Sequence, residues 1–399
     1  MSILRNYNRH FLTGTAIIGA VYLAQNMLSF ALPLLALEIS GTGAGFALIT
    51  GAGFVPNILF AIFVGVINDR MRKATGFRAY SVLLALSCGV LWVLMITELV
   101  NLAALAIFMI TLNLLGYAIG NLQFTLLRLT VPHTQLSDAT ALSSAINSTI
   151  STVGPALGGL ALYLIGGTGL VGVVTLLLLV SMFAAYTVTP EEPTPTHAPF
   201  WPSLREGFVV FARNRELVMM TIAVVLTNAA AGAFTVALIL KLKTGFAAND
   251  FQVGLVAAVG GVGSVLASSY APRLRRWLGY RAAFYWPIWV LALICFAGSA
   301  APAFWLLFVI SFVEGAFSIF YAIGVWSYRQ ESTDAAHMGR VAGITGAIFK
   351  LLMPPVIFLA GVLTDAEAVA AAFWLAAILN IAAALFLTTV AGWGWPRRS

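Results

Sequence analysis

The chain has 399 residues, of which 61% are hydrophobic and only 9% are charged. An ordinary soluble domain carries roughly 25% charged residues, so this chain has too few charges to cover a surface that faces water. Lipid must therefore be the solvent for most of it. The formal net charge of +7 does not indicate a nucleic-acid partner, because the basic residues stand in short runs between long apolar segments.

Apolar segments follow one another along the whole sequence. A membrane-spanning helix needs about 20 apolar residues, and twelve segments meet this length. The first is too long for the apolar core of a signal peptide, so we interpret it as a retained helix. Most connections are very short, which makes neighbouring helices antiparallel. The predicted spans are 11–37, 45–67, 79–97, 101–127, 139–165, 168–188, 217–240, 252–272, 282–300, 303–327, 341–363 and 367–391.

The basic residues predict the orientation. With the N-terminus inside the cell, all but three of the 21 Lys and Arg residues fall in cytoplasmic segments. The exceptions are Lys241 and Lys243, on the outside, and Lys350, within a helix. Cytoplasmic loops of membrane proteins carry such an excess of positive charge. We therefore expect a multi-pass protein of a bacterial inner membrane, with both termini in the cytoplasm.

One connection is much longer than the rest and divides the chain. Its first part is rich in proline and indicates a linker. Its second part has Ser203 and Glu206 at the spacing of a capping box, followed by apolar residues at helical spacing. This predicts an amphipathic helix on the cytoplasmic face. We expect an N-terminal six-helix bundle (1–189), a linker with this helix (190–216) and a C-terminal six-helix bundle (217–399).

A repeated segment relates the two halves. Residues 69–80 and 272–283 align without gaps at an offset of 203, and three arginines and one glycine match. A duplication in parallel orientation builds two bundles around an axis normal to the membrane. The predicted fold is therefore an all-α membrane protein with twelve transmembrane helices in two pseudo-symmetric bundles. The second copy has Pro272 where the first has Asp69.

Two motifs resemble those of a known family. The segment Gly65-Val-Ile-Asn-Asp69-Arg70-Met-Arg72-Lys73 resembles the loop signature of the major facilitator superfamily, although Arg72 stands where a second glycine is expected. The fifth span carries Gly154-Pro155-Ala-Leu-Gly158-Gly159, which resembles a signature common in drug/proton antiporters. Three further stretches, within 126–132, 203–208 and 329–341, resemble the macrolide-efflux and enterobactin-exporter branch.

The resemblance implies a secondary active transporter. It would export an amphipathic small molecule, such as a drug or a siderophore, by proton antiport and alternating access. Proton-coupled uptake of a small nutrient or metal chelate is the alternative, and a non-transporting receptor or membrane enzyme is the alternative from another class. The sequence has no Walker A motif and no metal-ligand spacing. We expect no enzyme activity, cofactor or metal; the expected partners are a small-molecule substrate, protons and the bilayer, and the expected state is a monomer.

The loop after the second span is the candidate gate. The resemblance implies that Asp69, together with Arg70, Arg72 and Lys73, forms a latch that holds the cytoplasmic side closed. An acid at this position is able to bind the start of a neighbouring helix, where the dipole favours negative charge. The alternative is a charged turn that only sets topology. The replacement of the acid by Pro272 in the second copy favours the latch.

Two ionisable residues lie deep inside predicted spans, Glu314 and Lys350. Such a group is costly at membrane depth and by default marks a functional site. We assign proton coupling to this pair, which the chain places at similar depths. Three interpretations stay open: a static buried ion pair, a contact that Glu314 exchanges for its proton, or a Lys350 that receives an anionic group of the substrate.

Polar and aromatic residues at helical spacing predict a central cavity. The alternative is ordinary hydrogen bonding between packed helices. In the fifth span the small residues Gly154, Pro155, Gly158 and Gly159 predict a helix that bends or approaches a neighbour closely. The candidate substrate-binding residues are Tyr22, Asn26, Asn113, Tyr117, Asn147, Asn228, Phe317, Tyr321 and Lys350.

Overall fold

The computed structural model describes residues 9–189, 200–334, 337–366 and 368–390, and none of these lies in a β-strand. The helices follow directly from long apolar runs bounded by glycine, proline and short polar turns. They are α1 (Arg9–Ser40), α2 (Gly43–Ala52), α3 (Val55–Leu59), α4 (Ala61–Arg70), α5 (Lys73–Ile96), α6 (Leu102–Thr130), η2 (His133–Gln135), α7 (Leu136–Ala185), α8 (Phe200–Arg213), α9 (Arg215–Leu240), η3 (Lys241–Gly245), α10 (Asp250–Ala300), α11 (Phe304–Ser332), α12 (Met338–Ile348), α13 (Met353–Asp365) and α14 (Val369–Thr389).

The described helices make up the twelve predicted spans. Ten helical stretches in this part of the chain are long and apolar enough to cross a membrane. One of them, α7, holds two spans that meet at Gly166, whose φ of +67° interrupts the helix. The remaining span consists of the shorter helices α2, α3 and α4. The predicted twelve-helix fold is confirmed. Most boundaries lie within a few residues of those expected, but the third span begins at Lys73 and not at 79, and the eighth runs to Gly279 and not to 272.

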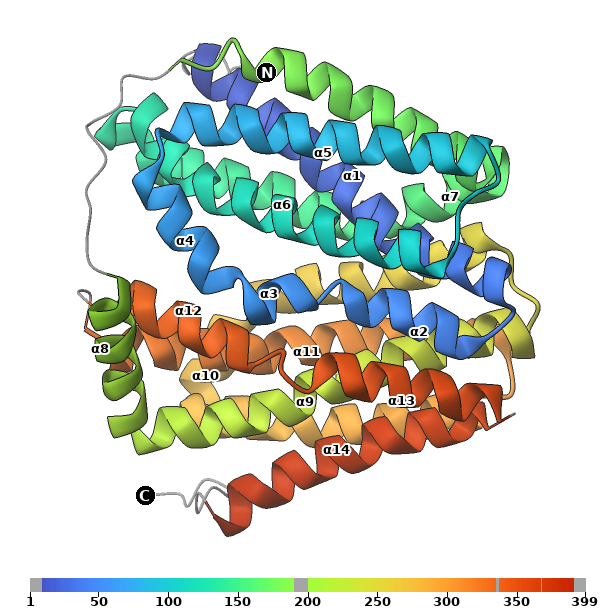
Figure 1. Ribbon diagram of the computed structural model, residues 1–399. Helices are drawn as coiled ribbons and strands as arrows, with labels where there is room; N and C mark the ends of the chain where they lie inside the picture. Colours follow the sequence, from blue (N-terminus) through green and yellow to red (C-terminus); the bar gives the residue numbers. More distant parts are fainter. Residues whose placement is uncertain (1–8, 190–199, 335–336, 367, 391–399) are drawn as a thin grey trace.

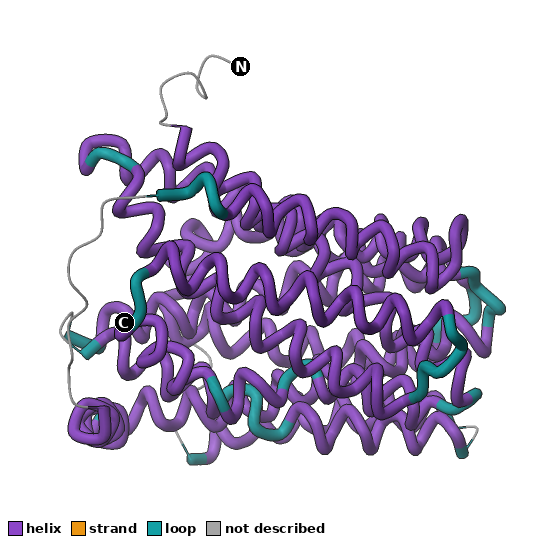
Figure 2. The backbone as a smooth tube through the Cα atoms, turned by 45° about the horizontal axis from the view of Figure 1, so that its top comes forward, coloured by secondary structure: helices purple, strands orange, loops and turns teal. Residues whose placement is uncertain are grey.

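The helices form two groups that lie side by side. Figure 1 shows α1 to α7 above and α9 to α14 below, with the long helices running in roughly one direction. Figure 2, turned by 45°, shows that most of the described loops lie at the ends of the helices. We call one end the basic end, because α8, the last turns of α6 and α11 and the kink of α10 at Gly279 lie there, and these carry Arg213, Arg128, Arg329 and Arg281. We call the other the opposite end.

The helix α8 ties the linker to the C-terminal group at the basic end. It packs against α12, and its Phe211 is buried in a cluster with Val341 and Ile344. The predicted amphipathic helix is present, but the predicted capping box is wrong, because α8 begins at Phe200 and Ser203 stands inside it. The residue Glu206 serves another purpose.

The carboxylate of Glu206 binds the start of α12. It lies 2.8 Å from Nε2 of His337 and accepts a hydrogen bond of 2.6 Å from Nη1 of Arg340. The hydrogen bond with His337, and then the charge of Arg340, hold the pKa of Glu206 below its ordinary value. This surface contact joins α8 to the span that carries Lys350.

Two spans are broken near their middle, which the sequence analysis did not predict. Pro56 lies in the short helix α3, between α2 and α4. In the eleventh span the break comes between α12 and α13, directly before Pro354 and Pro355. Proline has no N–H to donate and its ring clashes with the preceding turn, so each span is interrupted there. The broken spans face each other, because α2 packs against α13 and α3 against α12.

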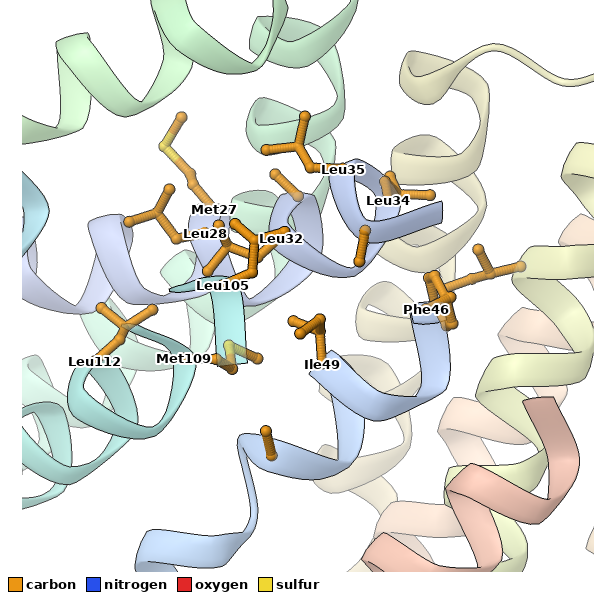
Figure 3. Close-up of a cluster of buried hydrophobic side chains, with 14 of the residues drawn as sticks. Met27, Leu28, Leu32, Leu34, Leu35, Phe46, Ile49, Leu105, Met109 and Leu112 are labelled. Atoms are coloured by element: carbon orange, nitrogen blue, oxygen red, sulfur yellow. The ribbon is translucent and has the colours of Figure 1, made fainter. Parts of the chain in front are cut away.

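At the opposite end the two groups touch through small residues. A Cβ added to Gly254 of α10 would lie 2.6 Å from the carbonyl oxygen of Pro155 in α7. A Cβ on Gly43 of α2 would lie 2.9 Å from the carbonyl oxygen of Gly361 in α13. Glycine at these positions lets backbones approach closely. Behind this contact the side chains of α1, α2 and α6 form an apolar core (Figure 3).

One acid reinforces this contact. The N–H groups of Gly43 and Ala44, at the start of α2, donate to the carboxylate of Asp365 at 2.5 Å and 2.9 Å. Asp365 ends α13 in the other half of the molecule. A carboxylate at a helix N-terminus binds unsatisfied N–H groups and complements the helix dipole. Asp365 therefore caps a helix across the boundary between the halves.

Candidate functional site

A cavity with two compartments lies between the two groups of helices. The larger compartment is about 880 Å³ and the smaller about 380 Å³. Asn57, Tyr117 and Lys350 line both, so the compartments meet at these side chains. The larger is lined by Tyr22, Gln25, Asn26, Ser29, Gly53, Phe54, Asn57, Asn113, Gly116, Tyr117, Gly120, Asn121, Thr125, Arg128 and Lys350. The smaller is lined by Asn57, Ala61, Tyr117, Val224, Asn228, Tyr321, Ala322, Val325, Trp326, Arg329, Ala342, Gly343, Gly346, Phe349 and Lys350.

The two broken spans meet the cavity at its centre. Asn57 lies in α3, and Lys350 lies in the turn between α12 and α13. The breaks are close together, since a Cβ on Gly51 would lie 3.4 Å from Cα of Pro354. Irregular backbone at membrane depth is tolerated where it lines a cavity, and interrupted helices commonly form the substrate sites of transporters. The breaks therefore mark the middle of the site.

The wall from the N-terminal half is rich in amides and phenols. Nε2 of Gln25 in α1 donates to Oδ1 of Asn113 in α6 at 3.2 Å. Nδ2 of Asn26 donates to the carbonyl of Tyr22 at 2.8 Å. Gln25, Asn26 and Asn113 all line the larger compartment, where a polar ligand would meet their amide groups.

The wall from the C-terminal half contains a hydrogen-bonded chain. The hydroxyl of Tyr321 in α11 donates to Oδ1 of Asn228 in α9 at 2.5 Å. Nδ2 of Asn228 then donates to the carbonyl of Phe349 at 3.0 Å. That carbonyl belongs to the break beside Lys350. The side chain of Asn228 thus connects α9 and α11 to the broken span.

The carboxyl group of Glu314 lies behind this wall. It accepts a hydrogen bond of 2.8 Å from Oγ of Ser318, one turn along α11. Glu314 is close enough to Cys295 and Tyr321 to interact with both electrostatically. It does not line either compartment.

The proposed contact between Glu314 and Lys350 is absent from this state. No hydrogen bond or ion pair joins the ammonium group of Lys350 to a described side chain, so the static ion pair is not formed. Lys350 lines both compartments, whereas Glu314 lines neither.

Comparisons with known proteins agree with this architecture. The family model of the Major Facilitator Superfamily matches residues 15–357. The chain belongs to the major facilitator superfamily. It is therefore a membrane transporter and not an enzyme. None of the curated proteins matches the chain.

Solved structures of other major facilitator transporters have the same fold. A bacterial homolog of the human lysosomal transporter Spinster, in an inward-facing and occupied conformation, has a TM-score of 0.76 at 10% identity, with 98% of each chain covered. The nucleoside transporter NupG has a TM-score of 0.73 at 12% identity and covers 94% of this chain and 100% of its own. The POT family transporter PepTSo has a TM-score of 0.74 at 12% identity, covering 97% and 98%. At these identities the likeness concerns the fold alone.

Most of the predicted substrate-binding residues lie at the cavity of this major facilitator chain. Asn147 and Phe317 do not line either compartment. Nδ2 of Asn147 instead donates to Oε1 of Gln123 at 3.4 Å, and the ring of Phe317 packs against Phe320. The predicted residues that line the cavity are Tyr22, Asn26, Asn113, Tyr117, Asn228, Tyr321 and Lys350.

Sequence reasoning missed several lining residues, among them Gln25, Asn57 and Arg329. For Asn57 a signal was present, since it follows Pro56 inside an apolar segment, and an interrupted helix points to a transporter site. Arg329 ends α11 and carries no such signal.

The loop that resembles the superfamily signature is held to its own half. Asn68 is buried; its Nδ2 donates to the carbonyl of Ala118 at 3.1 Å, and its Oδ1 accepts from Tyr80 at 2.8 Å. The ammonium group of Lys73 donates to the carbonyl of Asn68. Arg70 and Arg72 are exposed. The side chain of Asp69 lies outside the described part of the chain, so the latch stays a prediction.

The glycine-rich run of α7 lies between two neighbouring helices. A Cβ on Gly154 would lie 2.6 Å from Cβ of Asn26, and one on Gly158 would lie 2.8 Å from the carbonyl of Met27, both in α1. On the other side Gly159 abuts the backbone of Asp250 in α10. The backbone departs from helical geometry at Gly166, beyond the run. These contacts favour close packing over bending. Among the described residues no cluster of His, Cys, Asp and Glu is suited to a metal ion.

Proposed function

We propose that this chain exports a small molecule from the cytoplasm by proton antiport and alternating access. The observation that carries the proposal is the cavity at the centre of the molecule, walled by both halves and by two broken spans. Alternating access needs such a shared cavity, because rocking one half against the other then exposes it to each side in turn. In the described state the halves touch at the opposite end, and the cavity lies toward the basic end. This arrangement corresponds to one of the two states of the cycle.

The basic end would face the cytoplasm. Arg128, Arg213, Arg281 and Arg329 all lie there, as expected for the inner side of a bacterial inner membrane. The termini would then be cytoplasmic, and the two bundles would comprise residues 1–189 and 217–399, joined by 190–216. In this orientation the described state takes up its cargo from the cytoplasm. The cargo would be amphipathic, such as a drug or a siderophore, and the transporter would act as a monomer.

Glu314 is the proposed proton carrier. A charged carboxylate at membrane depth is costly, so a proton is needed whenever its surroundings dry out. The route from Glu314 to the cavity supports this role. Ser318 binds its carboxylate, and Tyr321 of the same helix binds Asn228, which holds the carbonyl of Phe349 at the break beside Lys350. A change of charge at Glu314 would act electrostatically on Tyr321, and Tyr321 is bonded to Asn228 of the substrate wall. Lys350 would receive an anionic group of the cargo.

Uptake by proton symport is the second candidate. The solved structures that resemble this fold include one named as a nucleoside transporter and one named as a bacterial metal transporter. A small nutrient or metal chelate would then enter the cell through the same cavity. The direction of coupling separates the two candidates.

Inverted inner-membrane vesicles test both direction and coupling. With a panel of drugs and siderophores, export predicts accumulation inside the vesicles when a proton gradient is imposed. Glu314→Gln should abolish this accumulation and leave substrate binding intact, since the amide keeps the size but carries no exchangeable charge. Glu98→Gln, in an exposed turn at the opposite end, is the matched control. Accumulation by the Glu314→Gln protein against a gradient would exclude the assigned role.

A further inference from the structure

The charges that line the cavity are all of one sign. Arg128 lines the larger compartment, Arg329 lines the smaller, and Lys350 lines both. No aspartate or glutamate is among the described residues of either wall. Three cations in a confined space between low-dielectric walls raise the local concentration of anions and repel cationic molecules.

These cations have no acidic partner within the described chain. The ion pairs there involve Lys243 with Asp250, Arg275 with Glu331, Arg281 with Glu216, and His337 and Arg340 with Glu206. Nη1 of Arg329 donates to the hydroxyl of Thr345 at 3.0 Å, and its buried Nε has no hydrogen-bond partner among the described atoms. Arg329 and Lys350 are half-buried, whereas Arg128 is exposed. For the two half-buried cations, the lack of a counter-charge is costly. A ligand that supplies the counter-charge removes that cost.

The cations come from both halves of the molecule. Arg128 comes from α6 in the N-terminal half, whereas Arg329 comes from α11 in the C-terminal half. Lys350 stands at the junction of the compartments, in the break of the eleventh span. A ligand with a single acidic group satisfies only part of this set. A ligand with acidic groups at both ends satisfies it from both halves at once.

We infer that the substrate is an organic anion with at least two acidic groups, bound between Arg128 on one side and Arg329 on the other, with Lys350 between them. The acidic groups are carboxylates or phosphates, which guanidinium groups bind with two parallel hydrogen bonds. The body of the molecule carries hydroxyl or amide groups that match the amides of the larger compartment. This inference rests on the proposed function and narrows its cargo from amphipathic molecules in general to polyanions.

Binding to the purified, detergent-solubilised protein tests the inference without any gradient. The probes share one aromatic ring and differ in charge: benzoate, isophthalate, a longer biphenyl dicarboxylate, and dimethyl isophthalate. Ligand binding raises the melting temperature in proportion to affinity and concentration, which gives the dissociation constant. We expect a dicarboxylate to bind at least about tenfold more tightly than benzoate, and the ester to give no shift, because each charge-assisted hydrogen bond contributes about that factor. Phenyl phosphate and resorcinol bisphosphate show whether phosphate serves as well as carboxylate.

Substitutions test which cation binds each acidic group of the ligand. Arg128→Gln and Arg329→Gln should each lower dicarboxylate affinity about tenfold and leave benzoate affinity within twofold, because Lys350 still holds one group. Lys350→Gln should weaken both ligands, and Lys350→Arg should restore them, which separates loss of charge from misfolding. Arg213→Gln removes an exposed cation of α8 at the same end and should change nothing. An ester that binds as well as the dianion, or an unchanged ratio of dianion to benzoate affinity in both arginine variants, would overturn the inference.

The two proposals fail separately. Selective binding of dianions without proton-driven accumulation in inverted vesicles would refute export and leave the substrate class standing. Proton-driven accumulation of neutral or cationic cargo, with no charge preference in the binding series, would refute the substrate class and leave export standing. Dicarboxylate binding that persists unchanged in the triple variant of Arg128, Arg329 and Lys350 would place the anion site elsewhere.

Discussion

The interface between the halves has different residue types at its two ends. At the opposite end, backbones meet through Gly43, Gly254 and Gly361, and one acid from one half caps a helix of the other. Toward the basic end the halves diverge around a cavity whose wall carries amides, phenols and three cations. Close contact needs small residues with no charge to desolvate, whereas a substrate site needs oriented polar groups.

The difference shows how one interface serves both as a seal and as a site. The seal depends on shape, so any added atom disturbs it. The site depends on charge and hydrogen bonding, so it tolerates a change of shape better than a change of polarity. Closing the cavity would bring Arg128 toward Lys350 and Arg329, and their mutual repulsion opposes closure until an anion lies between them.

The largest effect is expected from breaking the seal. Gly254→Ala places a Cβ 2.6 Å from the carbonyl oxygen of Pro155 and 3.2 Å from Cα of Ala156, and backbone atoms are unable to rotate away. Overpacking of this kind costs about 1–3 kcal/mol. We expect the halves to separate at this end and transport to fall about tenfold or more. The distance between spin labels at positions 98 and 244, which are exposed at the opposite end of the two halves, should lengthen.

A glycine with room around it provides the control. A Cβ on Gly14 of α1 meets nothing within 4 Å, so Gly14→Ala should leave both the label distance and transport unchanged. If the Gly254→Ala and Gly14→Ala proteins have the same distance between the labels at 98 and 244, the small residues do not hold the two halves together at the opposite end.

Hydropathy was sufficient to predict the spans but not their interruptions. The second and eleventh spans were each predicted as one helix, because averaging over about 20 residues hides a single proline such as Pro56. All but three of the basic residues were predicted to share one end, and within the described chain Arg128, Arg213, Arg281 and Arg329 do lie together at the basic end. The pairing of small residues across the halves requires the rotation of each helix about its axis, and a nearly uniform apolar segment does not reveal it.

The unknown rotation of each helix also explains why the expected contact between Glu314 and Lys350 is not formed. Counting residues along the helices predicts similar depths for Glu314 and Lys350, but it does not predict the surroundings of either group. Lys350 lines the cavity and Glu314 does not, because helix packing decides which side of a span faces the cavity. Seven of the nine predicted binding residues line the cavity because polar side chains inside a span have few other favourable positions.

A smaller effect is expected from removing the acid of the seal. Asp365→Ala leaves the N–H groups of Gly43 and Ala44 without their partner, and loss of a helix cap costs about 0.5–2 kcal/mol. The population that is open at the opposite end should rise several-fold, as measured with the same pair of labels. Asp365→Asn keeps one acceptor and should have an intermediate effect.

A cap within one half serves as the control for Asp365, because its loss lowers helix stability without touching the seal between the halves. Asn101 accepts a hydrogen bond of 2.9 Å from the N–H of Ala104 at the start of α6 and makes no such bond to the other half. Asn101→Ala should lower thermal stability by a similar amount but leave the label distances unchanged. Equal distance distributions for the Asp365 and Asn101 variants would show that the cap of α2 does not hold the halves together.

The smallest effect concerns the exposed contact of α8 at the basic end. The pKa of Glu206 is lowered in the folded protein by His337 and Arg340, so its carboxylate stabilises the docking of α8 at and above the ordinary carboxyl range. This contribution is lost as the pH falls through the lowered pKa, since the protonated acid no longer attracts the start of α12. A spin label at the exposed position 205 should become more mobile on that acid side, and Glu206→Gln should have the higher mobility already at neutral pH. Glu331→Gln, whose partner Arg275 lies away from α8, should behave as the wild type. Because Glu206 is open to solvent, Phe211 and its apolar neighbours hold α8 in place, and an acid transition that released α8 completely would contradict this ranking of the two contacts.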